Sequence, residues 1–364
     1  MSQVVIYIMV SFAILGVIDK LIGNKLGFGE KFDEGFNMMG SLAISMLGIY
    51  CLSPVIANWL LPVLLPLSKI TGADPSIFIS SVLACDMGAY STAVRIAQNE
   101  TIANFSGIIL GAGMGATISF TIPVATSLVR KEDFPYFAKG ILSGLVTIPI
   151  GCIAGGLMMG MSMNTMLINL VPVIILSIII AICLIKFQDK IIQVFGWIGK
   201  IIFFISMIGL ILNILDFILG IKIVPGMIPF EEGLIIVGKV TIVLSGAYCL
   251  IYFISKLLKS KLTSIGKFMG INDIAVLGII TSLASNVPML GVYKDMDWKG
   301  KIINASFAVG GAFVIGGQLG FISGISKEMI APFVVSKIVS GISGIAVSYL
   351  IIKLEKQPRI EESC

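Results

Sequence analysis

Histidine is absent from this chain of 364 residues. A nucleophile activated by histidine, a zinc site of the HExxH type and a haem held by histidine all need the imidazole, so the sequence excludes them. Cysteine is scarce as well. Of the six cysteines, five lie in apolar runs and Cys364 is the last residue, without the spacing of a disulfide framework or a metal site. The sequence therefore predicts no enzyme, no metal and no cofactor.

Charged residues are also few. They make up 12% of the chain, against 57% for hydrophobic residues, and the mean hydropathy is +1.04. A soluble domain carries about 25% charged residues, so this composition suits a lipid bilayer instead. The net charge of +5 comes mainly from lysines and arginines beside the apolar runs, where such side chains reach lipid headgroups. We therefore expect membrane lipid, and not nucleic acid, as a partner.

Apolar runs recur along the whole chain, and many approach the length of about 20 residues that a helix needs to cross a bilayer. We predict an all-α polytopic membrane protein with about eleven spans, at residues 4–21, 36–56, 76–96, 103–129, 137–161, 166–185, 197–219, 234–257, 274–293, 302–322 and 329–352. Two further segments, 59–70 and 257–267, are too short or too rich in lysine to cross. They are predicted to be amphipathic helices at the membrane interface.

Two parts of the chain match each other in sequence. Residues 32–35 (FDEG) match 230–233 (FEEG), and 48–52 (GIYCL) match 246–250 (GAYCL), both at an offset of 198. We therefore predict a single transporter domain (1–364), made of one repeat at about 31–161, linker spans at 162–228, a second repeat at about 229–352 and a short polar tail at 353–364. Duplicated carriers bind their substrate near the bilayer midplane, often where helices are interrupted.

Asp86 stands in the middle of an apolar segment, where ionisation costs several kcal/mol without a partner. Asn286 takes the corresponding place in the second repeat, and Gly88 and Pro288, which favour interrupted helices, follow closely. One interpretation is that Asp86 pairs with a substrate ammonium while Asn286 bonds a hydroxyl. The other is a structural hydrogen bond between helices. Lys239 and Arg95 are the basic residues considered as partners that would neutralise Asp86.

Four further residues are weaker candidates for substrate binding. Tyr90 lies one turn beyond Asp86 and could offer its ring to a cation or anchor the chain at the interface. Thr117 and Gln318 lie in glycine-rich spans, and Thr147 begins a Pro/Gly break at 147–151. Glycines at a spacing of four (107, 111 and 115; 316, 320 and 324) favour close helix packing and would also permit a homodimer.

Several motifs together resemble the ethanolamine permease family, EutH, over nearly the whole chain. They are 32–36 (FDEGF), 83–88 (LACDMG), 147–156 (TIPIGCIAGG), 286–289 (NVPM) and 319–321 (LGF). The resemblance implies a facilitator in the bacterial cytoplasmic (inner) membrane that takes up ethanolamine, in its ammonium form, for catabolism. The residues agree, because an ammonium joined to a hydroxyl needs a carboxylate and an amide or hydroxyl.

Two alternatives stay open at this point. In the first, the chain is a sodium- or proton-coupled carrier of another small amine, an amino acid or a nucleoside, and Asp86 holds the coupling ion. In the second, from a different class, it is a sensor or assembly subunit that binds amine without moving it.

Overall fold

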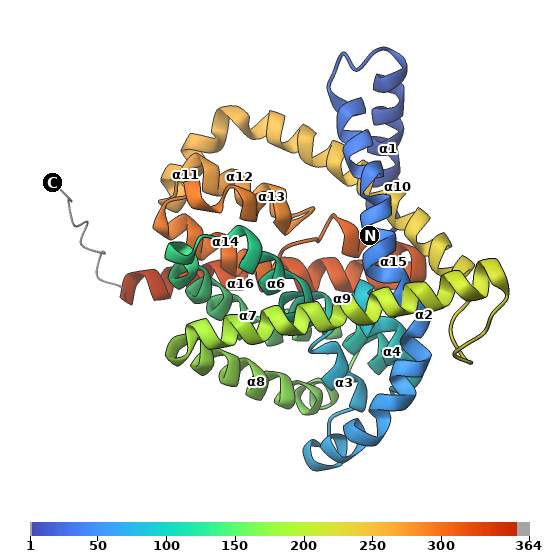
Figure 1. The fold of residues 1–364 in the computed structure, drawn as a ribbon. Coiled ribbons are helices and arrows are strands. Elements are labelled where there is room, and N and C mark those ends of the chain that lie inside the picture. Colours follow the sequence, from blue (N-terminus) through green and yellow to red (C-terminus); the bar gives the residue numbers. More distant parts are fainter. Residues whose placement is uncertain (1, 355–364) are drawn as a thin grey trace.

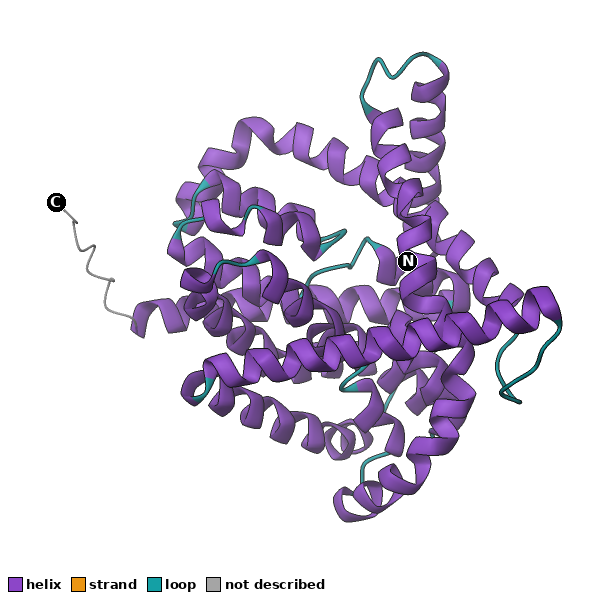
Figure 2. Ribbon diagram, in the orientation of Figure 1, coloured by secondary structure: helices purple, strands orange, loops and turns teal. Residues whose placement is uncertain are grey.

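The computed structural model describes residues 2–354, without the side chains of Ser2 and of residues 184, 185, 188, 189, 191 and 192. Regular structure in this part of the chain is helical (Figure 1 and Figure 2). The first half contains α1 (Ser2–Leu21), α2 (Phe28–Thr71), α3 (Pro75–Ser80), the π-helical η1 (Cys85–Ala89), α4 (Tyr90–Ile96), α5 (Glu100–Asn104), the π-helical η2 (Phe105–Gly115) and η3 (Thr117–Thr121), α6 (Ile122–Leu128), the 3₁₀ turn η4 (Lys131–Asp133), α7 (Phe134–Met158) and α8 (Met163–Lys186). The second half contains α9 (Gln188–Leu219), α10 (Phe230–Leu258), the 3₁₀ turn η5 (Lys259–Lys261), α11 (Leu262–Met269), α12 (Asp273–Ser282), α13 (Asn286–Gly291), the 3₁₀ turn η6 (Tyr293–Asp295), α14 (Trp298–Gly310), α15 (Gly317–Ile325), the 3₁₀ turn η7 (Lys327–Met329) and α16 (Ile330–Leu354). From residue 355 on, the predicted tail lies outside the described residues.

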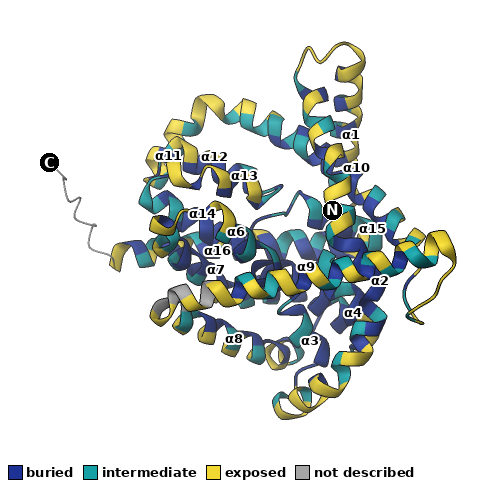
Figure 3. Cartoon of the chain, in the orientation of Figure 1, coloured by how far each residue is buried: buried dark blue, intermediate teal, exposed yellow. Residues whose placement is uncertain are grey.

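Eight helical stretches within residues 2–354 are long and apolar enough to cross a bilayer, at Gln3–Leu21, Phe28–Thr71, Glu100–Leu128, Lys131–Met158, Met163–Cys183, Gln193–Leu219, Phe230–Met269 and Lys327–Leu354. Large apolar side chains such as Ile178 on α8 and Phe204 on α9 point outward, whereas the centre of the molecule is buried (Figure 3). An apolar outer surface of this extent fits lipid and not water. The chain is therefore a multi-pass membrane protein.

Three of the eleven expected spans are broken into short helices. The segment 76–96 forms α3, η1 and α4; the segment 274–293 forms α12, α13 and η6; and the segment 302–322 forms most of α14 and α15 with a turn between them. Backbone groups released by such breaks are tolerated in a membrane protein only where protein or a cavity surrounds them. These segments are accordingly largely buried, and η2, at the centre of the fold, is buried along its whole length.

The two expected interfacial helices turn out differently. Residues 59–70 are not a separate element, because they belong to α2. This helix is 44 residues long and includes Pro54, Pro62 and Pro66. Residues 59–70 are helical as expected, and their place at the membrane interface stays a prediction. α2 curves along its length in Figure 1, in keeping with the backbone bonds that proline removes. Residues 257–267 contain the end of α10, the 3₁₀ turn η5 and most of a separate short helix, α11, which begins at Leu262.

The two predicted repeats pack on each other through matching helices. α2 lies along α10, and α7 lies along α16. A Cβ added to Gly35 on α2 would meet the backbone of Ser245 at 2.6 Å, and a Cβ added to Gly233 on α10 would meet Leu47 at 2.6 Å. Gly35 and Gly233 are related by the offset of 198, and so are Leu47 and Ser245. These reciprocal contacts fit a duplication, which itself stays a prediction.

Candidate substrate cavity

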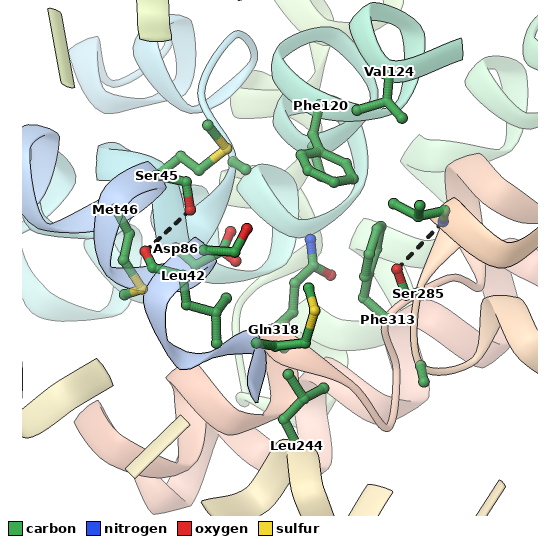
Figure 4. Close-up of a pocket in the computed structure, with 18 of the residues that line it drawn as sticks. Leu42, Ser45, Met46, Asp86, Phe120, Val124, Leu244, Ser285, Phe313 and Gln318 are labelled. Carbon is green, nitrogen blue, oxygen red and sulfur yellow. Dashed lines mark hydrogen bonds between the residues drawn. The ribbon is translucent and has the colours of Figure 1, made fainter. Parts of the chain in front are cut away.

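A cavity of about 380 Å³ lies among the broken helices. Its walls come from α2, η1, η3, α6 and α10, together with α13, α15 and the turns that precede them. Most of the lining is apolar and includes Leu42, Met46, Phe120, Val124, Leu244 and Phe313 (Figure 4). The polar lining residues are Ser41, Ser45, Asp86, Tyr248, Ser285 and Gln318. A concave, mainly apolar site with a few convergent polar groups is the usual form of a small-molecule site.

Asp86 is the only acidic residue among the described residues that line this cavity. The turn at η1 places it there: Ala84 is extended, Met87 is non-helical, and Gly88 has a φ of +100°, which glycine adopts without a Cβ clash. The thiol of Cys85 lies 3.8 Å from Oδ1 of Asp86 and is a weak donor. None of the ion pairs found within residues 2–354 includes Asp86. The cavity therefore presents a carboxylate that a small cation could neutralise.

Gln318 faces the same cavity from the first turn of α15 (Figure 4). Its side chain is buried, and Nε2 donates a hydrogen bond of 3.2 Å to the carbonyl of Ala112 on η2. The other end of the amide, Oε1, is buried without a hydrogen-bond partner among the described residues. A buried acceptor without a donor is costly, so this oxygen is suited to accept a hydrogen bond from a ligand in the cavity.

Two aromatic rings close one side of the cavity. Phe120 and Phe313 meet edge to face, with 5.7 Å between the ring centroids, and both line the cavity. Phe313 has a φ of +62°, unusual for a residue with a side chain, and its backbone N–H is bonded to the carbonyl of Ser282 at the end of α12. The breaks before α13 and α15 are thus tied together at the cavity wall.

A second cavity of about 300 Å³ adjoins the first. It is lined by Lys31, Glu34 and Tyr252 nearer the surface, and it shares three lining residues with the first cavity: Tyr248, Ala284 and Ser285. Lys31 and Glu34, both partly exposed, form an ion pair at its outer side. These three residues therefore border both the outer cavity and the cavity that Asp86 lines.

Of the six residues predicted to bind substrate, Asp86 and Gln318 line the cavity and the other four do not. Asn286 is buried beside it, and its amide nitrogen donates to Thr121 Oγ1 at 3.1 Å and to the carbonyl of Ala308 at 3.3 Å. Its neighbours Ser285 and Val287 line the cavity instead. Tyr90 packs edge to face against Phe321, with 6.2 Å between the ring centroids.

The two predicted threonines bond to nearby backbone. The hydroxyl of Thr117 donates to the carbonyl of Gly113, four residues earlier, at 2.8 Å. The hydroxyl of Thr147 donates to Gly144 at 2.8 Å and to Ser340 on α16 at 3.2 Å. Both hydroxyls therefore contribute to helix packing in this structure. Their proposed role in binding, like that of the other four residues, stays a prediction.

Sequence reasoning missed Lys337. It lies in α16 and is 2% exposed, and its Nζ donates a hydrogen bond of 2.9 Å to the carbonyl of Ala112, which also accepts from Gln318. The signal was the same as for Asp86: a charged residue in the middle of an apolar run, 329–352. Lys239, which the sequence suggests as a partner of Asp86, instead donates a hydrogen bond to the carbonyl of Gly324 in a different groove.

The glycines at a spacing of four lie in close contacts between segments of this same chain. A Cβ on Gly115 would meet the carbonyl oxygen of Leu83 at 1.8 Å, and a Cβ on Gly316 would meet that of Ala284 at 1.9 Å. Glycine at these positions lets the backbones around η1 and α13 approach the neighbouring segments. The predicted homodimer therefore has to rest on other surfaces.

The sequence comparisons bear on this architecture. A family described as "Ethanolamine utilisation protein, EutH" matches residues 1–351. The chain belongs to the EutH family. It is 43% identical over 362 residues, 99% of this chain and 97% of the relative, to a protein of Listeria monocytogenes named "Probable ethanolamine permease EutH". A protein of Escherichia coli with the same name is 36% identical, over 97% of this chain and 96% of its own length.

Another relative, of Bacillus subtilis, is named "Uncharacterized protein YxeR" and is 43% identical over 95% of this chain and 93% of its own length. No solved structure matches this EutH family member at a significant level. The cavity of this chain combines a carboxylate, an amide whose oxygen has no donor among the described residues, and aromatic walls. Such a set can hold a small organic cation that also carries a hydrogen-bond donor.

Proposed function

We propose that this protein carries ethanolamine, as the protonated amino alcohol, across the bacterial cytoplasmic membrane and supplies it to catabolism. The observation that carries the proposal is the carboxylate of Asp86, which faces the cavity without an ion pair to any described residue. Charged residues within membrane spans are rare, face the bundle interior or a cavity, and mark substrate or ion pathways. The names of the relatives from L. monocytogenes and E. coli support the same substrate.

The cavity has a group for each end of ethanolamine. The ammonium would lie against Asp86, where a charge-assisted hydrogen bond is strongest. The hydroxyl would donate to Oε1 of Gln318, which otherwise has no donor among the described residues. The two methylenes would lie against Phe120 and Phe313. Desolvation of the small cation is thus offset at both polar ends.

The outer cavity gives the substrate a route. An amine would first meet Glu34 in the outer cavity and then pass Tyr248 and Ser285, which line both spaces, to reach Asp86. Tyr248 and Ser285 belong to the second predicted repeat, whereas Glu34 and Asp86 belong to the first, so a small displacement of one repeat against the other would open or close the passage. Such a displacement is the common mechanism of duplicated carriers.

Uptake into proteoliposomes tests the proposal. The native protein should take up radiolabelled ethanolamine, and Asp86→Asn should reduce uptake at low substrate concentration by at least about 30-fold, since loss of one partner of a buried charge pair costs about 2–5 kcal/mol. Asp295→Asn is the matched control, because that side chain is exposed in η6, and it should leave uptake unchanged. Equal uptake by native protein and Asp86→Asn, with both folded by size-exclusion chromatography, would contradict the proposal.

A further inference from the structure

Lys337 is a buried ammonium that the proposed transport step does not use. It sits in the eighth position of α16, 2% exposed. A lysine at this depth is costly to keep charged unless oxygen atoms replace its hydration. One such oxygen is the main-chain carbonyl of Ala112, at 2.9 Å from Nζ.

An oxygen-bearing side chain at the cavity lies next to the carbonyl that holds this ammonium. The carbonyl of Ala112 also accepts from Gln318, whose Oε1 has no partner among the described residues. No ion pair joins Lys337 to Asp86 among the described residues, but Gln318, which shares the Ala112 carbonyl with Lys337, lines the same cavity as Asp86. Main-chain carbonyl, amide and carboxylate oxygens are the hard ligands that small cations use in membrane carriers.

We propose that the Lys337 ammonium permanently occupies a site for a monovalent cation beside the substrate cavity, in the place that an exchangeable ion such as sodium would otherwise take. The inference deepens the proposed function and rests on it for its consequence. A tethered cation partly balances the charge of Asp86 whether the cavity is full or empty. The substrate ammonium can therefore leave Asp86 without exposing an unbalanced carboxylate in the membrane interior, and no coupling ion is needed.

Removal of the lysine side chain should turn the tethered site into a vacant one. Lys337→Ala leaves the carbonyl of Ala112, Oε1 of Gln318 and the charge of Asp86 in place but removes the ammonium. Sodium, or methylammonium as a copy of the lysine head, should then bind. Lys337→Met removes the charge but fills most of the same volume, so it should bind neither.

Thermal unfolding of the purified protein in detergent measures this binding without any transport. The probes are sodium chloride and methylammonium chloride, compared with N-methylglucamine chloride at the same ionic strength. We expect both small cations to raise the unfolding midpoint of Lys337→Ala by several degrees more than that of the native protein or of Lys337→Met. If Lys337→Ala folds only when purified with either small cation, that result also supports the proposal.

Several outcomes would overturn it. A midpoint of Lys337→Ala that responds to the small cations no more than the native midpoint would do so, as would a Lys337→Ala protein that no cation restores. Equal responses of Lys337→Ala and Lys337→Met would show an effect unrelated to the vacated space. Uptake of ethanolamine by the native protein is measured separately, so failure of the proposed function leaves the unfolding result readable.

Discussion

Gln318 shares with Asn286 and Asn304 a bonded amide nitrogen and a buried amide oxygen without a partner among the described residues, but of these three residues only Gln318 lines the cavity. Its nitrogen is fixed on Ala112, its oxygen is buried without a donor among the described residues, and the residue lines the cavity. This arrangement costs free energy in the empty protein, because a buried acceptor without a donor loses about 1–3 kcal/mol. A ligand hydroxyl recovers that loss, whereas a methyl group in its place does not. Gln318 is therefore where ethanolamine would be distinguished from a simple alkylamine.

Substitution of Gln318 tests this role. We expect Gln318→Leu to reduce the preference for ethanolamine over n-propylamine, its analogue with a methyl in place of the hydroxyl, by roughly tenfold, the equivalent of about 1.4 kcal/mol. The measurement is competition of each amine with radiolabelled ethanolamine in proteoliposomes. Thr117→Val is the control, since that hydroxyl bonds its own helix and does not line the cavity, and its preference should stay native. An unchanged preference in Gln318→Leu would exclude the hydroxyl contact.

For single residues, the sequence predicts some functional features and not others. A charge inside an apolar run can be recognised from the sequence, and both Asp86 and Lys337 carry that signal. The orientation of an uncharged group cannot be recognised in this way. The hydroxyl of Thr117 donates a hydrogen bond to the carbonyl four residues earlier, as threonine in a helix commonly does. The amide nitrogen of Asn286 donates to Thr121 and Ala308. Which polar groups face a cavity depends on neighbours that lie far away in the chain.

Some features of the helices can be predicted from the sequence and others cannot. Long apolar runs predict the long helices, because lipid requires each backbone group to be bonded within its own segment. The breaks are harder to predict, since a broken segment enclosed by protein remains as apolar as an intact one. Gly88 was expected to interrupt its helix and does, with a φ of +100°. Pro288 instead lies in the first turn of α13, where proline removes no helical bond, and the break precedes it.

Two close helix contacts extend the predicted duplication beyond its expected boundaries. A Cβ on Gly48 of α2 would lie 1.7 Å from the carbonyl oxygen of Ser206 on α9, and a Cβ on Gly246 of α10 would lie 2.0 Å from that of Met9 on α1. Gly48 and Gly246 are related by the offset of 198, and Met9 and Ser206 by 197. α1 and α9, predicted to belong to neither repeat, thus pack on equivalent partners.

Glycine substitutions test whether the two contacts are equivalent. Gly48→Ala and Gly246→Ala should each destabilise the protein by about 1–3 kcal/mol, because backbone on the facing helix must move. Gly40→Ala and Gly238→Ala are the matched controls, related by the same offset on the same two helices, and a Cβ at either position meets nothing within 4 Å. These should be neutral or stabilising by about 0.5–1 kcal/mol. Thermal unfolding in detergent gives the comparison, and equal midpoints for all four variants would refute the packing.

The whole molecule combines an apolar outer surface with a charged interior. Lipid-facing helices such as α8 and α9 expose isoleucine and phenylalanine, while Asp86 and Lys337 lie near the cavity at the centre. The two charges are opposite in sign, so the empty site has little net charge. A bound substrate ammonium then adds one positive charge, and the loaded carrier moves that charge through the membrane field.

A membrane potential should therefore drive uptake without a second ion. A monovalent cation that enters down a negative-inside potential gains about 2.3 kcal/mol per 100 mV, enough for roughly 50-fold accumulation. Proteoliposomes with a potassium diffusion potential, in sodium-free buffer at equal pH on both sides, should accumulate ethanolamine, and collapse of the potential with external potassium should abolish the gradient. Sodium should add nothing for the native protein, because Lys337 already holds the site where it would bind. Uptake that needs sodium, or a proton gradient, would instead favour the ion-coupled carrier in which Asp86 holds the coupling ion.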